Sequence, residues 1–154
     1  VYTGVYVGWI EAVALWNNAA TPALFALSSL SAGISTVFVI APFVRDATRL
    51  SGWMLLLHRV HLAVLVLELV MLAGVVAFEF SNPFAHESLA ILFDPSGLGS
   101  WFVVGLVGLG LLVPLAVEAF VTATKRLVRA LPVDLLCIAG GLVLRFCVVW
   151  SGMH

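Results

Sequence analysis

The stretch Trp53–Phe78, WMLLLHRVHLAVLVLELVMLAGVVAF, decides the fold, because it is an apolar run long enough to cross a lipid bilayer as a helix. The run nevertheless contains His58, Arg59, His61 and Glu68. Placing a charged side chain at the centre of a membrane costs about 2.5 kcal/mol or more. Such residues are retained in membranes when they pair, face water or carry protons, so the sequence predicts a membrane protein with a polar interior.

Three further segments are long and apolar enough to span a membrane, namely Thr21–Val44, Ser100–Thr124 and Val133–Gly152. The whole chain shares this character, since 63% of its 154 residues are hydrophobic and its mean hydropathy is +1.19. We therefore expect an all-α fold, a polytopic transmembrane helix bundle that forms a single transmembrane domain over residues 1–154. The opening stretch Val1–Trp16 is expected to be the end of a preceding helix or an interfacial segment.

The charges between the spans predict how the bundle is oriented. Alternating spans place one set of basic residues on the same side, together with Asp46 and Asp134: Arg45, Arg49, Arg59, Lys125, Arg126 and Arg129. The other side holds Glu11, Glu79, Glu87 and Asp94 without any Lys or Arg. Basic loops are typically cytoplasmic, so we expect the C-terminal His154 outside and a prokaryotic cytoplasmic membrane as the location. Ala85–Phe93 is a candidate for a short interfacial helix in the outer loop.

The polar groups inside the spans are the candidate functional residues, and we interpret them as a proton path. His61 and Glu68 are seven residues apart and therefore lie on one face of their helix. Counted inward from the basic side, Glu118 lies at the depth of His61, and Arg145 lies beyond the midplane. His58 is placed at the cytoplasmic end, where it is expected to be solvated. The alternative is a static Glu68–Arg145 ion pair that only fixes the packing of the helices.

The sequence argues against a metal or nucleic-acid site in this chain. A net charge of −1 without a basic stripe excludes a nucleic-acid partner. Buried histidines occur on one predicted helix only, which disfavours a haem held between two helices of this chain. Cys137 and Cys147 are ten residues apart on one helix, about 15 Å, too far for a disulfide, and we interpret both as packing residues.

The order of several short motifs resembles the NrfD/polysulfide reductase C family, specifically its C-terminal half. The opening stretch contributes Tyr2-Thr3-Gly4 and Trp16-Asn17-Asn18, and the first two spans contribute Pro22-Ala23-Leu24-Phe25, Ser31-Ala32-Gly33 and His58-Arg59 with Glu68. The last two contribute Trp101-Phe102, Gly105–Leu111, Pro114, Gly140–Phe146 and Ser151-Gly152. The resemblance covers the whole chain.

The resemblance implies a membrane anchor that exchanges electrons between quinone (menaquinone or ubiquinone) and an iron–sulfur subunit. That partner is ferredoxin-like, carries several [4Fe-4S] clusters and docks on the outer face. It connects to a catalytic molybdenum-type subunit or a multihaem cytochrome. The anchor itself holds no metal, and further N-terminal helices complete it within the membrane lipid. Tyr2 would border the quinone, while Glu68, Arg145 and His58 would lie on the polar path; the roles of His61 and Glu118 rest only on their depth.

Two other classes of function remain open from the residues alone. A transporter or channel module would bind a solute at its interior charges, and paired Gly/Pro breaks in its helices would favour it. Only the third span, with its glycines and Pro114, has such a break. A purely structural subunit with silent interior ion pairs is the third reading.

Overall fold

The computed structural model describes residues 20–43, 47–81, 90, 93–94, 98–124 and 131–151. Over these residues the chain is almost entirely helical and contains no strand. Four helices are long and apolar enough to cross a membrane: Ala20–Ile40, Trp53–Phe78, Trp101–Thr124 and Leu131–Trp150. The predicted all-α class is confirmed, and the chain is a multi-pass membrane protein.

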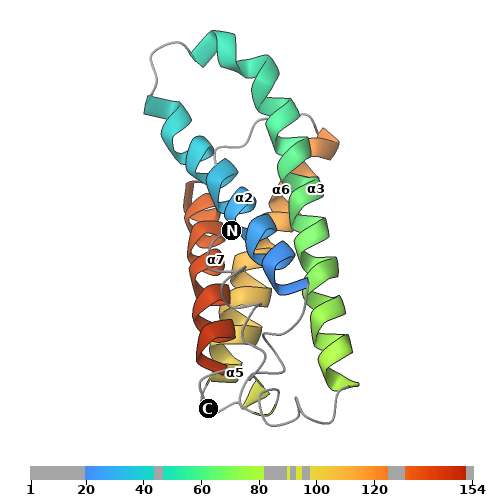
Figure 1. The fold of residues 1–154 in the computed structure, drawn as a ribbon. Coiled ribbons are helices and arrows are strands. Elements are labelled where there is room, and N and C mark those ends of the chain that lie inside the picture. Colours follow the sequence, from blue (N-terminus) through green and yellow to red (C-terminus); the bar gives the residue numbers. More distant parts are fainter. Residues whose placement is uncertain are drawn as a thin grey trace.

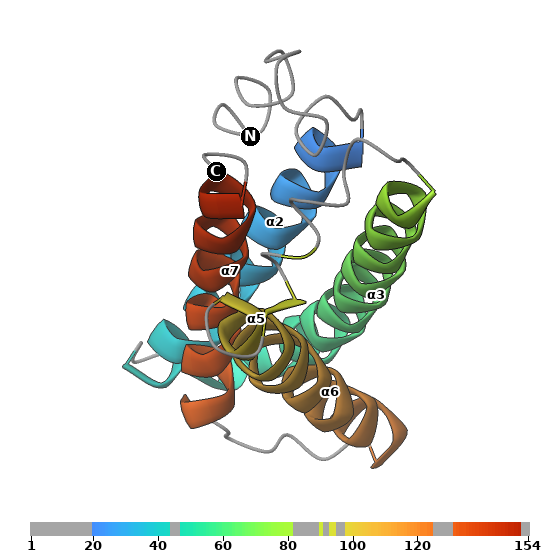
Figure 2. The ribbon, with the colours of Figure 1, turned by 90° about the horizontal axis from the view of Figure 1, so that it is seen from below.

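The four spans run alternately up and down and form the corners of one bundle (Figures 1 and 2). Helix α2 (Ala20–Ile40) packs against both α3 (Ala47–Phe80) and α7 (Leu131–Ser151). The third span is made of a short α5 (Leu98–Ser100), η3 (Trp101–Leu112) and α6 (Val113–Thr124), and it closes the ring by contacting α3 and α7. Helices α3 and α7 consequently lie at opposite corners of the bundle.

Four helix ends lie together at one end of this bundle, which we call the α2–α3 end. Helices α2 and α6 finish there, and α3 and α7 begin there (Figure 1). The predicted alternation of the spans therefore holds. Residues 44–46 and 125–130, which carry most of the predicted basic charge, lie outside the described residues, as do residues 1–19 with Tyr2, and most of Ala85–Phe93.

Prolines mark the helix ends. Pro22 and Pro132 each lie in the first turn of a helix, α2 and α7, where the missing N–H has no intrahelical partner to lose. Asp134 adds a negative charge to the first turn of α7, where the helix dipole favours it. At the other end of α2, the 3₁₀ turn η1 (Ala41–Phe43) contains a proline that prevents the α-helix from continuing.

The third span is irregular in a way that its sequence explains. Residues Trp101–Leu112 form a π-helix, and the Val113 N–H donates to the Gly108 carbonyl, five residues earlier. The π-helix ends just before Pro114, which has no N–H and cannot continue either hydrogen-bond pattern. Pro114 was expected to kink this span; the change from π to α geometry at that point is how the chain accommodates it.

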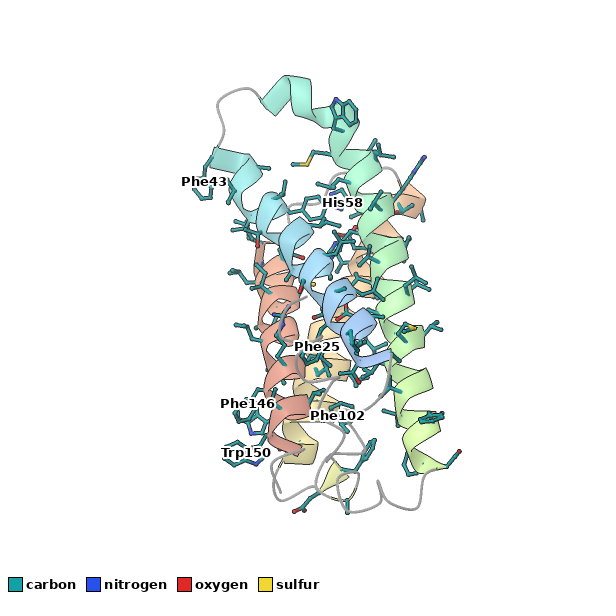
Figure 3. The ribbon with its side chains drawn as sticks, in the orientation of Figure 1. Phe25, Phe43, His58, Phe102, Phe146 and Trp150 are labelled. Atoms are coloured by element: carbon teal, nitrogen blue, oxygen red, sulfur yellow. The ribbon has the colours of Figure 1, made fainter. Side chains whose placement is uncertain are left out.

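The closest approach in the bundle joins the third span to α7. A Cβ on Gly110 would lie 2.7 Å from the Gly140 Cα, and a Cβ on Gly140 would lie 2.5 Å from the Gly110 Cα. Only glycine permits this backbone contact, as in other tightly packed membrane helices. Phe25 and Phe102 fill the core on the side of this contact away from the α2–α3 end (Figure 3), whereas Phe146 and Trp150 stack on each other at the outer surface of α7.

Candidate functional site

The carboxylate of Glu118 joins two histidines in the interior. His58 Nδ1 lies 2.7 Å from Glu118 Oε2, and His61 Nδ1 lies 2.9 Å from Glu118 Oε1. An ionised carboxylate can only accept hydrogen bonds, so both Nδ1 atoms carry the hydrogen. Glu118 and His61 are almost completely buried, and the His58 side chain is 12% exposed. The predicted common depth of His61 and Glu118 is thus a direct contact, and His58 is part of it rather than solvated.

The other ring nitrogen of His61 faces hydroxyl and thiol groups. Its Nε2 lies 3.2 Å from Ser31 Oγ, 3.4 Å from Ser35 Oγ and 3.8 Å from Cys137 Sγ. Ser31 Oγ also lies 3.2 Å from Cys137 Sγ. All four spans therefore contribute to one connected cluster: Ser31 and Ser35 from α2, His58 and His61 from α3, Glu118 from α6 and Cys137 from α7.

The aromatic ring of Phe38, on α2, packs against this cluster. Phe38 stacks on the His58 ring with centroids 4.2 Å apart and an angle of 17° between the planes, and its centroid lies 5.6 Å from that of His61. The position of His58 near the α2–α3 end is visible in Figure 3. Phe38 fixes the two imidazole planes and limits the approach of water from this side.

Glu68 lies about 10 Å further along α3, since seven residues separate it from His61. Its side chain is almost completely buried, and it interacts electrostatically with Ser28, His61 and Arg145. The Ser28 hydroxyl faces it without hydrogen-bond geometry and has no hydrogen-bond partner among the described residues. An unpaired buried hydroxyl beside a buried carboxyl is a place where a water molecule is expected.

Arg145 is not paired with Glu68. Its Nη2 donates to Ser29 Oγ at 2.7 Å, and Ser29 in turn donates to the Phe25 carbonyl at 2.7 Å. No ion pair between Glu68 and Arg145 lies within 4.0 Å, although both side chains are described. The alternative of a static Glu68–Arg145 pair is therefore wrong. The cause is the topology: α3 and α7 occupy opposite corners, and α2 lies between them with Ser28 toward Glu68 and Ser29 toward Arg145.

Arg145 also lies at the depth of Glu68 rather than beyond it. Helices α3 and α7 run in the same direction, and His61 on one faces Cys137 on the other. Seven residues further along, Glu68 is level with Leu144. The prediction that Arg145 lies beyond the midplane is therefore replaced by two levels of polar residues, one at His61 and Glu118 and one at Glu68 and Arg145.

Sequence reasoning missed Ser31, Ser35, Phe38, Cys137 and Asp134 as members of this site. Asp134 precedes Cys137 by one helical turn and interacts electrostatically with Glu118, His61 and His58. The signal was present, because Asp134 and Cys137 share a face of α7, and Ser31 and Ser35 share a face of α2. Both cysteines are free and buried, but only Cys137 has polar partners among the described residues.

A metal site is not formed by these side chains. Within the described ranges, no group of three or more His, Cys, Asp and Glu residues has the arrangement that would hold a metal ion. The His58, His61 and Glu118 side chains are instead bonded to one another. What the arrangement offers chemically is a buried hydrogen-bonded chain that can hold and pass protons.

Comparison with known proteins agrees with the motifs. The family model described as "Polysulphide reductase, NrfD" matches residues 1–154, the whole chain. The chain is 24% identical over 152 residues to "Protein NrfD" of Escherichia coli (strain K12), covering 98% of this chain and 48% of that protein. It is 26% identical over 156 residues to "Protein NrfD homolog" of Haemophilus influenzae (strain ATCC 51907 / DSM 11121 / KW20 / Rd), with the same coverage of 98% and 48%.

The chain thus spans about half the length of these curated relatives. No solved structure matches it. The match of the family model over the full sequence, the four apolar spans and the expected motifs in the expected order agree with one another. This chain belongs to the polysulphide reductase NrfD family of integral membrane proteins.

Proposed function

We propose that this chain is part of the membrane anchor of a respiratory oxidoreductase complex. In this proposal the anchor exchanges electrons between the quinone pool and a ferredoxin-like iron–sulfur subunit on its outer face, which leads to a molybdenum-type subunit or a multihaem cytochrome. Membership of the NrfD family and the four membrane spans support the proposal. The α2–α3 end, with the basic segments, is assigned to the cytoplasm of a prokaryotic cell.

The observation that carries the proposal is the buried His58–Glu118–His61 cluster. Quinone is a substrate that gains or loses two protons with its two electrons, so a protein that reacts with it inside a membrane needs a route for protons. Two imidazoles bridged by one carboxylate suit this task, because imidazole binds and releases protons near neutral pH. The sequence-predicted quinone residue, Tyr2, lies outside the described residues and stays a prediction.

The cluster can pass a proton without moving its side chains far. A proton that arrives at His61 Nε2 allows the same ring to release the hydrogen on Nδ1 to Glu118. For Glu118 to pass this proton on, His58 has to be in the tautomer with its hydrogen on Nε2, so that its Nδ1 accepts the proton from Glu118 and the Nε2 hydrogen leaves from the more exposed of the two rings. Asp134, which interacts electrostatically with the cluster from α7, lies beside this exit.

Glu68 is assigned to the inner part of the route. It lies two helical turns deeper than His61 on the same face of α3. The hydroxyl of its neighbour Ser28 has no hydrogen-bond partner among the described residues, which favours a water molecule between Ser28 and Glu68. Arg145 contributes a positive charge at the same depth while it remains bonded to Ser29. In this role the guanidinium lies near Glu68 without an ion pair that would immobilise the carboxyl.

The test is quinone-linked electron transfer and proton uptake in membranes that contain the full complex, with Glu118→Gln and Glu68→Gln compared with wild type. Glu79→Gln, near the end of the same helix α3, is the matched control. Assembly is followed by co-purification of the iron–sulfur subunit. We expect both interior variants to assemble and to lose at least tenfold in turnover, since positioned proton transfer contributes about 10²–10⁴ to rates.

Three other results would contradict parts of this proposal. Normal turnover in both assembled variants would refute a role in proton transfer and leave the cluster as a contact that joins four helices. Loss of co-purification in the interior variants, but not in Glu79→Gln, would show the same structural role. Turnover that is absent in wild type with every quinone tested would refute quinone as the substrate.

A further inference from the structure

Cys137 is the one thiol among the described residues with polar contacts, and nothing in the proton route above uses it. Its Sγ lies 3.2 Å from Ser31 Oγ and 3.8 Å from His61 Nε2, and the side chain is buried on α7. Cys147, ten residues later on the same helix, is equally buried in the apolar core and has no hydrogen bond in the described part of the chain. The two thiols therefore have different surroundings in one protein.

More potential hydrogen-bond donors surround His61 Nε2 than it can accept from, so at least one of them needs another acceptor. With the Nδ1 hydrogen directed to Glu118, a neutral imidazole has a single lone pair, on Nε2. Three potential donors surround this lone pair, namely Ser31, Ser35 and Cys137. Ser31 is the nearest, and its oxygen can at the same time accept a hydrogen from the Cys137 thiol. The result is a chain in which Cys137 donates to Ser31 and Ser31 donates to His61.

Protonation of His61 reverses the direction of this chain. Nε2 then carries a hydrogen and needs an acceptor, and the Ser31 oxygen at 3.2 Å provides it. The Ser31 hydrogen has to turn away, toward a group that accepts. The Cys137 sulfur is such a group, because a thiol is both a weak donor and a weak acceptor. One sulfur atom thus completes the hydrogen bonds of Ser31 in both protonation states of His61.

We infer that Cys137 is a positioning residue for proton transfer at His61, acting through the hydroxyl of Ser31. The inference deepens the proposed function and rests on it. The proton never resides on the sulfur: Glu68 gives it up at the inner end of the proposed route, a water carries it to His61 Nε2, and the Ser31 hydroxyl rotates from Nε2 toward Sγ. Removal of the sulfur takes away the acceptor that Ser31 uses when His61 is protonated, and the hydroxyl then has to turn away from His61 toward the backbone, as Ser29 does with the Phe25 carbonyl.

The first test does not depend on activity. Infrared spectroscopy of the S–H stretch in the full complex, with difference spectra against Cys137→Ala and Cys147→Ala, assigns the two thiol bands. We expect the Cys137 band at lower frequency and broader than the Cys147 band, because its sulfur is hydrogen-bonded. Two bands at the same frequency would refute the inference.

The second test compares proton uptake during turnover in Cys137→Ala, Cys137→Ser and Cys147→Ala. We expect Cys137→Ala to be slower by about tenfold, the effect of losing one neutral hydrogen bond, while Cys137→Ser stays within about twofold of wild type, because its hydroxyl also donates and accepts. Cys147→Ala is the matched control, since it leaves a cavity of the same size on the same helix and should leave the rate unchanged.

The outcomes distinguish this inference from the proposed function. Equal slowing by both alanine variants, or failure of Cys137→Ser to restore the rate, would overturn the role of Cys137 and indicate a packing effect. A normal rate in Cys137→Ala together with a slow Glu118→Gln would overturn only this inference. Normal rates in Cys137→Ala and Glu118→Gln would overturn the proposed function as well.

Discussion

Replacing Gly140 by alanine places one methyl group between two backbones. The new Cβ would lie 2.5 Å from the Gly110 Cα, 3.2 Å from its carbonyl carbon and 3.3 Å from its carbonyl oxygen. These neighbours are backbone atoms of η3, so no side chain can rotate away. Ordinary contact begins at 3.4 Å, and α7 and the third span would therefore have to separate by about 1 Å.

The expected cost is about 1–3 kcal/mol, the range for forcing an extra carbon into a packed interior. The lost dispersion contacts along the rest of the α7–η3 interface belong to the same cost, because a gap of about 1 Å forfeits a large part of each contact. Alanine has a higher helix propensity than glycine by about 1 kcal/mol, which offsets part of it. We expect a net destabilisation of about 1–2 kcal/mol.

The assay is reversible unfolding of the purified protein in mixed micelles of increasing denaturing detergent. Gly33→Ala and Gly74→Ala are matched controls, since no atom lies within 4 Å of the added Cβ at either position. Both controls should be as stable as wild type or more stable. A Gly140→Ala variant that unfolds at the same detergent fraction as Gly33→Ala would refute the close approach of the two backbones.

Three further predictions, on five substitutions, can be followed in the same unfolding assay. Glu118→Gln should destabilise by about 1–3 kcal/mol, because the amide NH₂ replaces one of the two oxygens that accept from His58 and His61 and cannot itself accept; unchanged stability would mean that the two bonds contribute nothing. Ser31→Ala should destabilise by about 1 kcal/mol, and Ser28→Ala should cost less, since the Ser28 hydroxyl has no hydrogen bond to a protein group among the described residues; the reverse order would contradict the hydrogen-bond assignment. Ser29→Ala should cost about 1 kcal/mol in wild type and close to nothing in an Arg145→Gln background, and additive effects in this double-mutant cycle would show that the bond between them is not formed.

Hydropathy was sufficient to predict the spans. The predicted Trp53–Phe78 span coincides with the span found in the structure, and the other three differ by a few residues at their ends. Lipid imposes this result, because a backbone in hydrocarbon must satisfy its hydrogen bonds internally and only long helices do so in a chain of this kind. The π-helix was not predicted, since the signal of several glycines before Pro114 indicates a break without specifying its geometry.

The sequence predicted how deep the site residues lie in the membrane, but not which neighbouring helix each side chain faces. Counting residues from the helix ends gave His61 and Glu118 the same level, and they are in contact. Counting cannot tell which helices are neighbours, so it left open the alternative of a static Glu68–Arg145 pair, which the structure does not form: α3 and α7 are at opposite corners, and Arg145 donates to Ser29. Cys137 was interpreted as a packing residue for the same reason. Whether a cysteine forms hydrogen bonds depends on which side chains of neighbouring helices lie beside it, and Ser31 was not known to be one of them.

The contribution of every span to one cluster has a consequence for biosynthesis. The spans enter the membrane in chain order, so Ser31 and Ser35 precede His61, and all three precede Glu118. Inserting an acidic residue near the centre of a helix costs about 2.5–3.5 kcal/mol, and the apolar residues around Glu118 offset that cost. When the third span inserts, His58 and His61, the two imidazole partners of Glu118, are already present in the membrane. A chain arrested before α6 would therefore hold the Nδ1 hydrogens of both histidines in the bilayer without their carboxylate acceptor, a feature that distinguishes an incomplete bundle from a finished one.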